Sequence, residues 1–200
     1  MIASSRDRIL DAAAEVMSRH GLAGSTTREI ARVAGCSEAL LYKHFADKEE
    51  IFLAVLSERL PQLIMLLKEL PARAGERTVA AQLTEVVEQA VPFFAVGLPI
   101  AGSLFARPDL AARHRDWLQA RGAGPHRANG QVAHYLRAEQ KLGRVAADAD
   151  PDAIAALLLG ACYQRAFLLQ LVGAADLTPP ADRFAPAVVA AVLRGVAPPP

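Results

Sequence analysis

Apolar side chains recur at helical spacing along almost the whole chain, and this pattern constrains the fold more than any other feature. Near the start, Ile9, Ala13, Val16 and Met17 fall on one stripe of a helix, and charged residues take the other side. The alternating runs of polar and β-branched residues that mark strands are missing. The sequence therefore predicts an all-α fold.

Glycines and capping residues divide the beginning of the chain into three short helices. The first helix ends at Gly21, because glycine adopts the left-handed conformation that closes a helix. Thr26 caps a second helix, which Gly35 ends after barely two turns. Ser37 caps a third helix, which runs to Phe45. Two short helices joined by a glycine turn form a helix-turn-helix, in which the second helix enters the major groove of DNA.

The rest of the chain is also expected to be helical. Asp47 caps a fourth helix, which Pro61 must kink or interrupt. A loop is expected over residues 71–77. Further helices are predicted at Thr78–Val96, Leu98–Phe105, Asp109–Gln119, Gly124–Lys141, Pro151–Val172 and Pro180–Leu193.

The composition is typical of a folded protein that has more apolar surface than usual to bury. Hydrophobic residues make up 52% of the 200 residues and charged residues 22%, which excludes large-scale disorder and indicates an oligomer interface or a ligand cavity. The net charge is only +1, so any DNA-binding face must be local. Cys36 and Cys162 lie far apart and outside any metal-ligand spacing, so a reducing cytoplasmic setting is expected.

Neither an export signal nor a membrane span is expected. The start of the chain has no apolar stretch followed by a small-residue cleavage site. Residues 153–175 are long enough to cross a bilayer, but Arg165 lies near the middle of that run. A central charge is unfavourable in lipid, whereas a helix buried in a dimer tolerates one that is paired.

The helix-turn-helix region resembles the signature of the tetracycline-repressor (TetR) family of regulators. The resemblance lies in the runs TREIA (27–31), AGCS (34–37) and LYKHF (41–45) and in Lys48. Cys36 departs from the aliphatic residue that the family usually has there, but cysteine behaves as a small hydrophobe, so the change is mild.

This resemblance implies a set of DNA contacts. Ala39 and Lys43 would reach base edges, Arg28 would contact a groove, and Ser37 would aim helix amides at a phosphate or base. Glu38 has two interpretations, a favourable acid in the first turn of its helix or an acceptor for cytosine. Phosphate contacts are implied for Thr27, Tyr42, His44 and Lys48.

The C-terminal half offers material for a ligand pocket and no catalytic constellation. Its histidines have no zinc-site spacing, and Asp148, Asp150 and Asp152 lack the glycine and glutamate of a calcium loop. No metal, cofactor or enzymatic activity is therefore expected. An apolar pocket with few polar groups is predicted from the scattered Phe93, Phe94, Phe105, Trp117, His134, Tyr163 and Phe167.

Together these features predict a helix-turn-helix DNA-binding domain at residues 1–48 and a ligand-binding and dimerisation domain at 49–200. The resemblance implies a cytoplasmic repressor that binds a palindromic operator in double-stranded DNA as a homodimer. Helices 151–172 and 180–193 would pair with their mates, and a largely apolar small molecule would release the DNA.

Three alternatives stay open at this point. A small helical enzyme would show turnover that depends on His114 or His134. A membrane-anchored helical protein would be found in the membrane fraction. An activator or a ligand-blind regulator would differ from a repressor in a reporter assay with and without inducer.

Overall fold

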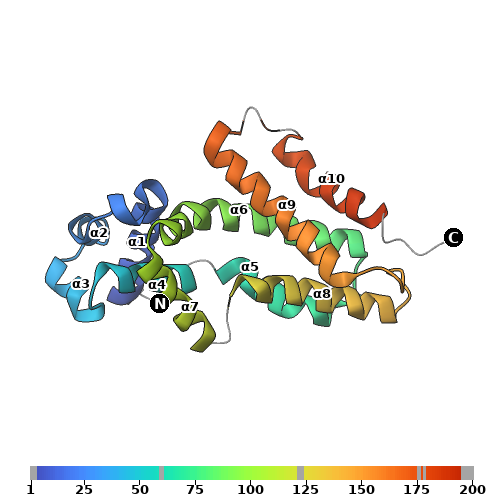
Figure 1. Ribbon diagram of the computed structural model, residues 1–200, viewed down its shortest axis with the longest axis horizontal. Coiled ribbons are helices and arrows are strands. Elements are labelled where there is room, and N and C mark those ends of the chain that lie inside the picture. Colours follow the sequence, from blue (N-terminus) through green and yellow to red (C-terminus); the bar gives the residue numbers. More distant parts are fainter. Residues whose placement is uncertain (1–3, 59–60, 121–123, 175–176, 178, 195–200) are drawn as a thin grey trace. The chain divides into compact units, whose positions relative to one another are not determined.

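The chain folds into helices, in a computed structural model that describes residues 4–58, 61–120, 124–174, 177 and 179–194 (Figure 1). No strand occurs within these described ranges, in agreement with the predicted all-α fold. The elements are α1 Ser5–Gly24, α2 Thr27–Val33, α3 Glu38–His44, α4 Lys48–Glu58, α5 Pro61–Glu69, the 3₁₀ helix η1 Leu70–Arg73, α6 Val79–Ala106, α7 Pro108–Ala120, α8 Pro125–Lys141, α9 Pro151–Val172 and α10 Ala181–Arg194.

The N-terminal unit comprises residues 1–61 and 96–122. Its core joins α1–α4 to the end of α6 and to α7, because Ile100 and Leu110 are fully buried in the same cluster as Leu41 and Phe52. Ion pairs from α7 and the residue before it also reach the start of α4, with Arg107 on Glu49 at 3.7 Å and Arg113 on Asp47 at 3.6 Å. This compact unit therefore extends past residue 48, and the domain boundary drawn there stays a prediction.

The C-terminal unit comprises residues 62–95 and 123–200. Helices α8 and α9 pack closely, and α10 lies beside α9 (Figure 1). The core of this unit includes Leu83 and Val86 of α6, Tyr135 and Leu136 of α8, and Leu158 of α9, each fully buried.

Local capping sets the starts of α2 and α3 as the sequence predicts, whereas α1 continues past its predicted end at Gly21 to Gly24. Gly21 (φ 62°) breaks the regular path of α1, and Gly35 (φ 65°) closes the turn after α2. The Thr26 hydroxyl accepts the Glu29 amide, and the Ser37 hydroxyl accepts the Leu40 amide. Side-chain oxygens at these positions satisfy amides that have no partner within the helix.

Helix α4 comprises Lys48–Glu58, and α5 begins at Pro61. Residues 59 and 60 lie outside the described part of the chain, so the kink or interruption expected at Pro61 stays a prediction. Proline suits a first helical position because the amide hydrogen it lacks would have no partner there. Asp47 caps α4 by accepting the Glu50 amide at 2.6 Å, as predicted.

The predicted break between helices 78–96 and 98–105 is wrong, because α6 runs without interruption over Val79–Ala106. Pro99 lacks the amide hydrogen that would bond the carbonyl of Ala95 four residues earlier. The side chain of Gln170 on α9 supplies a substitute, with its Nε2 donating to that carbonyl at 3.1 Å. The cost of Gly97 inside a helix, about 1 kcal/mol, is small enough for the packing of Ile100 to offset.

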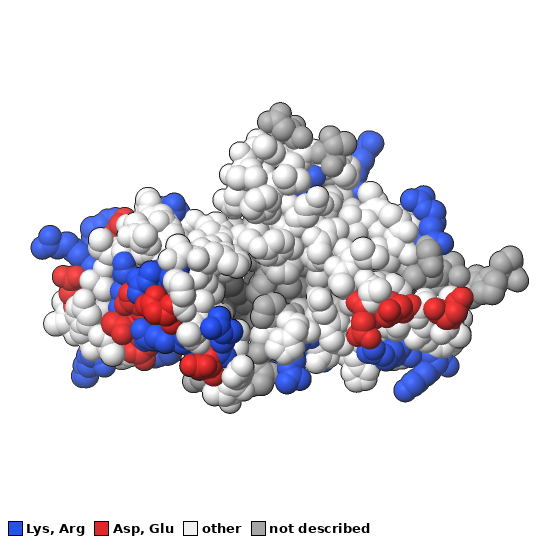
Figure 2. Space-filling view, in the orientation of Figure 1, with Lys and Arg blue, Asp and Glu red and all other residues white. Residues whose placement is uncertain are grey.

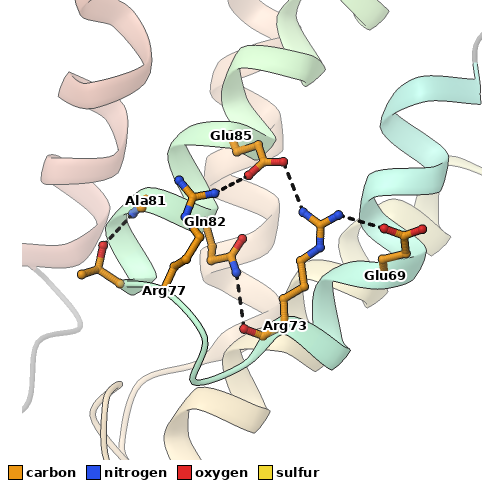
Figure 3. Close-up of polar contacts among 7 residues, drawn as sticks. Glu69, Arg73, Arg77, Ala81, Gln82 and Glu85 are labelled. Atoms are coloured by element: carbon orange, nitrogen blue, oxygen red, sulfur yellow. Dashed lines mark hydrogen bonds and ion pairs between the residues drawn. The ribbon is translucent and has the colours of Figure 1, made fainter.

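A polar network closes the corner between α5 and α6 (Figure 3). Arg73 bridges Glu69 and Glu85 at 2.8 and 3.2 Å, and Arg77 pairs with the other oxygen of Glu85 at 2.7 Å. Gln82, which is buried, donates to the carbonyl of Arg73 at 3.3 Å. These contacts fix the turn that the sequence predicts as a loop, and their charges are mutually compensated.

Candidate DNA-binding surface

Helix α3 presents a narrow outward ridge. Leu41 and Phe45, 0% and 2% exposed, anchor its inner side in the core of the N-terminal unit. Ala39 and Lys43 are one turn apart on the opposite side, and both are exposed. Side chains four residues apart stack on one face of a helix, so these two form a continuous edge. The structure thus brings together the two residues predicted to read base edges.

The flank of α3 that faces α2 carries a hydroxyl and carboxylate network. The Thr27 hydroxyl donates to Glu38 Oε1 at 2.9 Å, and the Tyr42 hydroxyl lies 3.3 Å from Thr27 Oγ1. Thr27 and Glu38 are the first residues of α2 and α3, so the network ties the two helix starts together. Tyr42 is 51% exposed, unlike the buried aromatic Phe45 beside it in sequence.

The opposite flank of α3 faces α1. His44 Nε2 and the Ser5 hydroxyl form a hydrogen bond of 2.8 Å. The next residue of α1, Arg6, places its guanidinium 5.3 Å from the centre of the Phe45 ring and binds both carboxylate oxygens of Glu58 at 2.7 and 2.8 Å. The hydrogen bonds that Arg6 donates to Glu58 raise the pKa of Arg6. Polar groups therefore line both sides of the ridge.

The remaining predicted contact residues lie in different settings. Arg28 is exposed at the second position of α2, and Ser37 uses its hydroxyl to cap α3. Lys48 is half-buried and donates to the carbonyls of Leu22 and Ser25 at 2.9 and 3.0 Å. Two of the three ammonium hydrogens thus hold the end of α1, and a phosphate contact by Lys48 stays a prediction that depends on the third.

Sequence reasoning missed Ser5, Arg6 and Glu58. They lie 39 to 52 residues from their partners, and neither a serine nor an ion pair at such separation has a local signal. Acidic and basic side chains are intermixed over the N-terminal helices on the face shown in Figure 2. The positive character needed for DNA must therefore come from individual side chains such as Lys43 and Arg28.

The seven aromatic or histidine residues predicted to line a pocket are divided between the units. Phe105, 84% exposed, and Trp117, stacked on His114, belong to the N-terminal unit. In the C-terminal unit, Phe94 makes edge contacts with Phe93 at 5.4 Å and Tyr163 at 5.6 Å. His134 and Phe167 are exposed. Only part of the predicted set is thus brought together, around Phe94.

A groove of about 660 Å³ lies between α9 and α10. None of the seven predicted pocket residues lines it, and their role in ligand binding stays a prediction. Among the described residues, no cluster of three or more His, Cys, Asp or Glu could hold a metal ion. The groove between α9 and α10 is lined by Asp148, Ala149, Asp150, Ala153, Ile154, Leu157, Ala161, Val188, Ala191 and Val192.

Among the described residues, two helices, α6 and α9, are long and apolar enough to cross a membrane by length and composition alone, a test that core helices of soluble proteins also pass. Arg165 of α9 is 5% exposed, donates to the carbonyl of Pro179 at 2.6 Å and lies 5.0 Å from the centre of the Phe184 ring. The central charge of α9 is thus accommodated by hydrogen bonding and ring stacking inside the C-terminal unit.

An exposed helix braced by a second helix across a glycine turn defines a helix-turn-helix protein. Residues 9–55 match the sequence model of the bacterial regulatory proteins of the tetR family. Residues 107–194 match that of the AefR-like transcriptional repressor C-terminal domain. The chain belongs to the TetR family.

Relatives and solved structures agree with this assignment. The HTH-type transcriptional repressor AcnR of Corynebacterium efficiens is 29% identical over 119 residues, 56% of this chain and 57% of that protein. The HTH-type transcriptional regulator SrpR of Pseudomonas putida is 44% identical over 55 residues, 28% of this chain and 26% of that protein. The chain therefore spans less than two thirds of these relatives.

Two crystal structures share the fold over nearly the whole chain. A protein from Mesorhizobium loti that is named as a TetR-family transcriptional regulator has a TM-score of 0.75, with 22% identity and 96% of each chain covered. The transcriptional regulator FadR of Bacillus subtilis, in complex with stearoyl-CoA, has a TM-score of 0.68 and 19% identity, and the match covers 94% of this chain and 97% of that one.

Proposed function

We propose that this protein is a cytoplasmic homodimeric transcriptional repressor that binds a palindromic operator in double-stranded DNA and is released by a largely apolar small molecule. The observation that carries the proposal is the exposed ridge of Ala39 and Lys43 with polar groups on both flanks. Such a ridge fits a major groove, with the flanking hydroxyl and imidazole groups next to the phosphates on either side.

The proposed dimer is supported by the outer face of α9. Leu157, Phe167 and Leu171 are 68%, 47% and 64% exposed on the side of the helix opposite its buried residues. Large apolar side chains exposed along one face of a helix indicate an interaction surface, and self-association by two-fold symmetry is the commonest way to bury one. A symmetric dimer would present two copies of α3 to two half-sites about 34–36 Å apart.

The proposed effector class is supported by the aromatic side chains around Phe94 and by the FadR structure with stearoyl-CoA. Edge-to-face rings from α6 and α9 offer an apolar surface with one hydroxyl, that of Tyr163. Because FadR is only 19% identical, stearoyl-CoA serves here as a first probe rather than as the assigned effector.

The test begins with selection of duplexes from a random pool by the full-length protein. The expected result is a palindromic consensus that binds at least about a thousandfold more tightly than a scrambled duplex. Lys43→Ala should weaken that preference. Stearoyl-CoA and shorter acyl compounds are then titrated into the complex, and DNA release is followed by fluorescence anisotropy. Failure to select any consensus would refute the proposed function.

A further inference from the structure

A carboxylate lies at the end of a chain of two hydroxyl groups on the flank of α3 that faces α2. Thr27 Oγ1 donates to Glu38 Oε1 at 2.9 Å and lies 3.3 Å from the Tyr42 hydroxyl. A threonine hydroxyl has a single hydrogen, which Thr27 donates to Glu38. The Tyr42 hydroxyl must therefore be the donor in its contact with Thr27. Both hydroxyl hydrogens therefore point along a chain that ends on the carboxylate of Glu38.

This arrangement conflicts with simple phosphate binding by Thr27 and Tyr42. A phosphate oxygen has no hydrogen to offer, so it can bind these hydroxyls only by taking the hydrogens that now point toward Glu38. Carboxylate and phosphate are both ionised acceptors and compete for the same hydrogens, and the carboxylate also repels the phosphate. The free protein is thus held in a state that disfavours backbone contacts on this flank.

A DNA base that donates a hydrogen bond to Glu38 can weaken this effect of the carboxylate on phosphate binding. Glu38 is adjacent in sequence to Ala39 of the ridge, and its carboxylate binds Thr27 on the flank, so in the proposed complex it would lie between the base edges and the backbone. Among base edges in the major groove, the N4 amino group of cytosine donates to a carboxylate. The Glu38 carboxylate can accept from cytosine and from Thr27 together, but the cytosine amino group offsets its charge, which lessens both the repulsion of a phosphate and the hold on the Thr27 hydrogen.

We propose that Glu38 makes the phosphate contacts of Thr27 and Tyr42 conditional on a cytosine amino group at one operator position. This inference rests on the proposed function, because it requires a duplex in the groove that α3 enters. Glu38 is then a specificity-determining residue whose main effect is to weaken binding to DNA of the wrong sequence. It resolves the two interpretations of Glu38 in favour of a base contact combined with a local hydrogen bond.

The test compares Glu38→Gln with Glu29→Gln in the full-length protein. Glu29 lies in the first turn of α2 and is half-buried, so its substitution removes the same charge without touching the Thr27 bond. The probes are the duplex selected by the wild-type protein and a scrambled duplex of the same composition. Circular dichroism confirms that each variant is folded.

Glu38→Gln is expected to tighten binding to the scrambled duplex and to lower the ratio of selected to scrambled affinity by at least about fivefold. A new selection with this variant should show a weaker preference for cytosine at one position, because the glutamine amide oxygen is uncharged. Glu29→Gln should leave the ratio unchanged. An equal drop in the ratio with Glu29→Gln would overturn the inference, since the effect would then be one of general charge.

A double-mutant cycle isolates the relay, the part of the Glu38 effect that acts through the Thr27 hydroxyl. Thr27→Val removes the hydroxyl and keeps the shape of the side chain, so Glu38→Gln in that background should tighten scrambled binding much less than it does in the wild type. Full additivity of the two substitutions would contradict the relay. A wild-type protein that selects a consensus while Glu38→Gln keeps its ratio would refute this inference alone, whereas a wild-type protein that selects none would refute the proposed function.

Discussion

Arg6 and Glu58 form a bidentate ion pair, with the two guanidinium nitrogens 2.7 and 2.8 Å from the two carboxylate oxygens. The pair joins the first turn of α1 to the last residue of α4. Arg6 also lies over the ring of Phe45, directly after α3, and its neighbour Ser5 bonds His44. The start of α1 is thus the point at which the ends of α3 and α4 are held together.

Arg6→Lys should loosen this junction without changing the net charge. Lysine cannot bind two carboxylate oxygens in parallel or stack on Phe45 as a planar group. Because both partners are about 40% exposed, the expected loss in free energy of unfolding is only about 0.5–1 kcal/mol. Urea denaturation measures this loss, and amide exchange should become faster at residues 44–46. Arg8→Lys, at an exposed position two residues away, is the control and should change neither quantity.

Features that depend on residues close together in the sequence could be predicted, and features that depend on distant residues could not. The boundaries set by Thr26, Ser37 and Asp47 depend on amides three residues away, so local rules locate them. The continuity of α6 depends on Gln170, which lies 75 residues from the carbonyl that it satisfies. No local pattern contains that information, and Gly97 and Pro99 alone indicate a break.

In the candidate DNA-binding surface, too, local features could be predicted from the sequence and long-range contacts could not. The exposure of Ala39 and Lys43 follows from the helical spacing around Leu41 and Phe45, so the ridge could be predicted from the sequence. The bond between Thr27 and Glu38 could not, because it depends on the angle at which α2 and α3 meet across the glycine turn.

Lys48→Met should expose the structural role of the ammonium group. The substitution keeps most of the apolar stem and removes the hydrogen bonds to Leu22 and Ser25, so the free energy of unfolding should fall by about 1–3 kcal/mol. If the third hydrogen reaches a phosphate, as the family resemblance implies, the slope of log affinity against log salt should also fall by about 0.9. Unchanged stability in urea would contradict the capping of α1 by Lys48.

Acid should destabilise the protein through His114. Burial lowers the pKa of His114 below its ordinary value of 6.5, because its Nδ1 is buried without a hydrogen-bond partner. Below pH 6.5 the unfolded chain binds a proton that the folded chain resists, so the free energy of unfolding falls as the pH falls through that value. Urea denaturation at several pH values should show a smaller fall for His114→Gln. The exposed His134 provides the control, since His134→Gln should retain the full dependence.

Lys43→Ala should relax sequence preference at one operator position. Lysine on the ridge can donate to O6 or N7 of guanine, and such a contact discriminates against the wrong base by about 1–3 kcal/mol. Competition between the selected duplex and its single-base variants measures the change position by position. A uniform loss across all variants would instead indicate a phosphate contact.

Gly160 provides a test of the α9 face that is independent of DNA. A Cβ atom added at Gly160 meets nothing within 4 Å in the single chain, and glycine costs about 1 kcal/mol relative to alanine in a helix. Gly160→Leu should therefore not destabilise an isolated subunit, but it should disrupt a dimer whose helices approach closely along this face. Gly130 of α8 also has open space around it, so Gly130→Leu is the matched control. Sedimentation velocity should show a shift toward monomer for Gly160→Leu alone, and an unchanged dimer would place the subunit interface elsewhere.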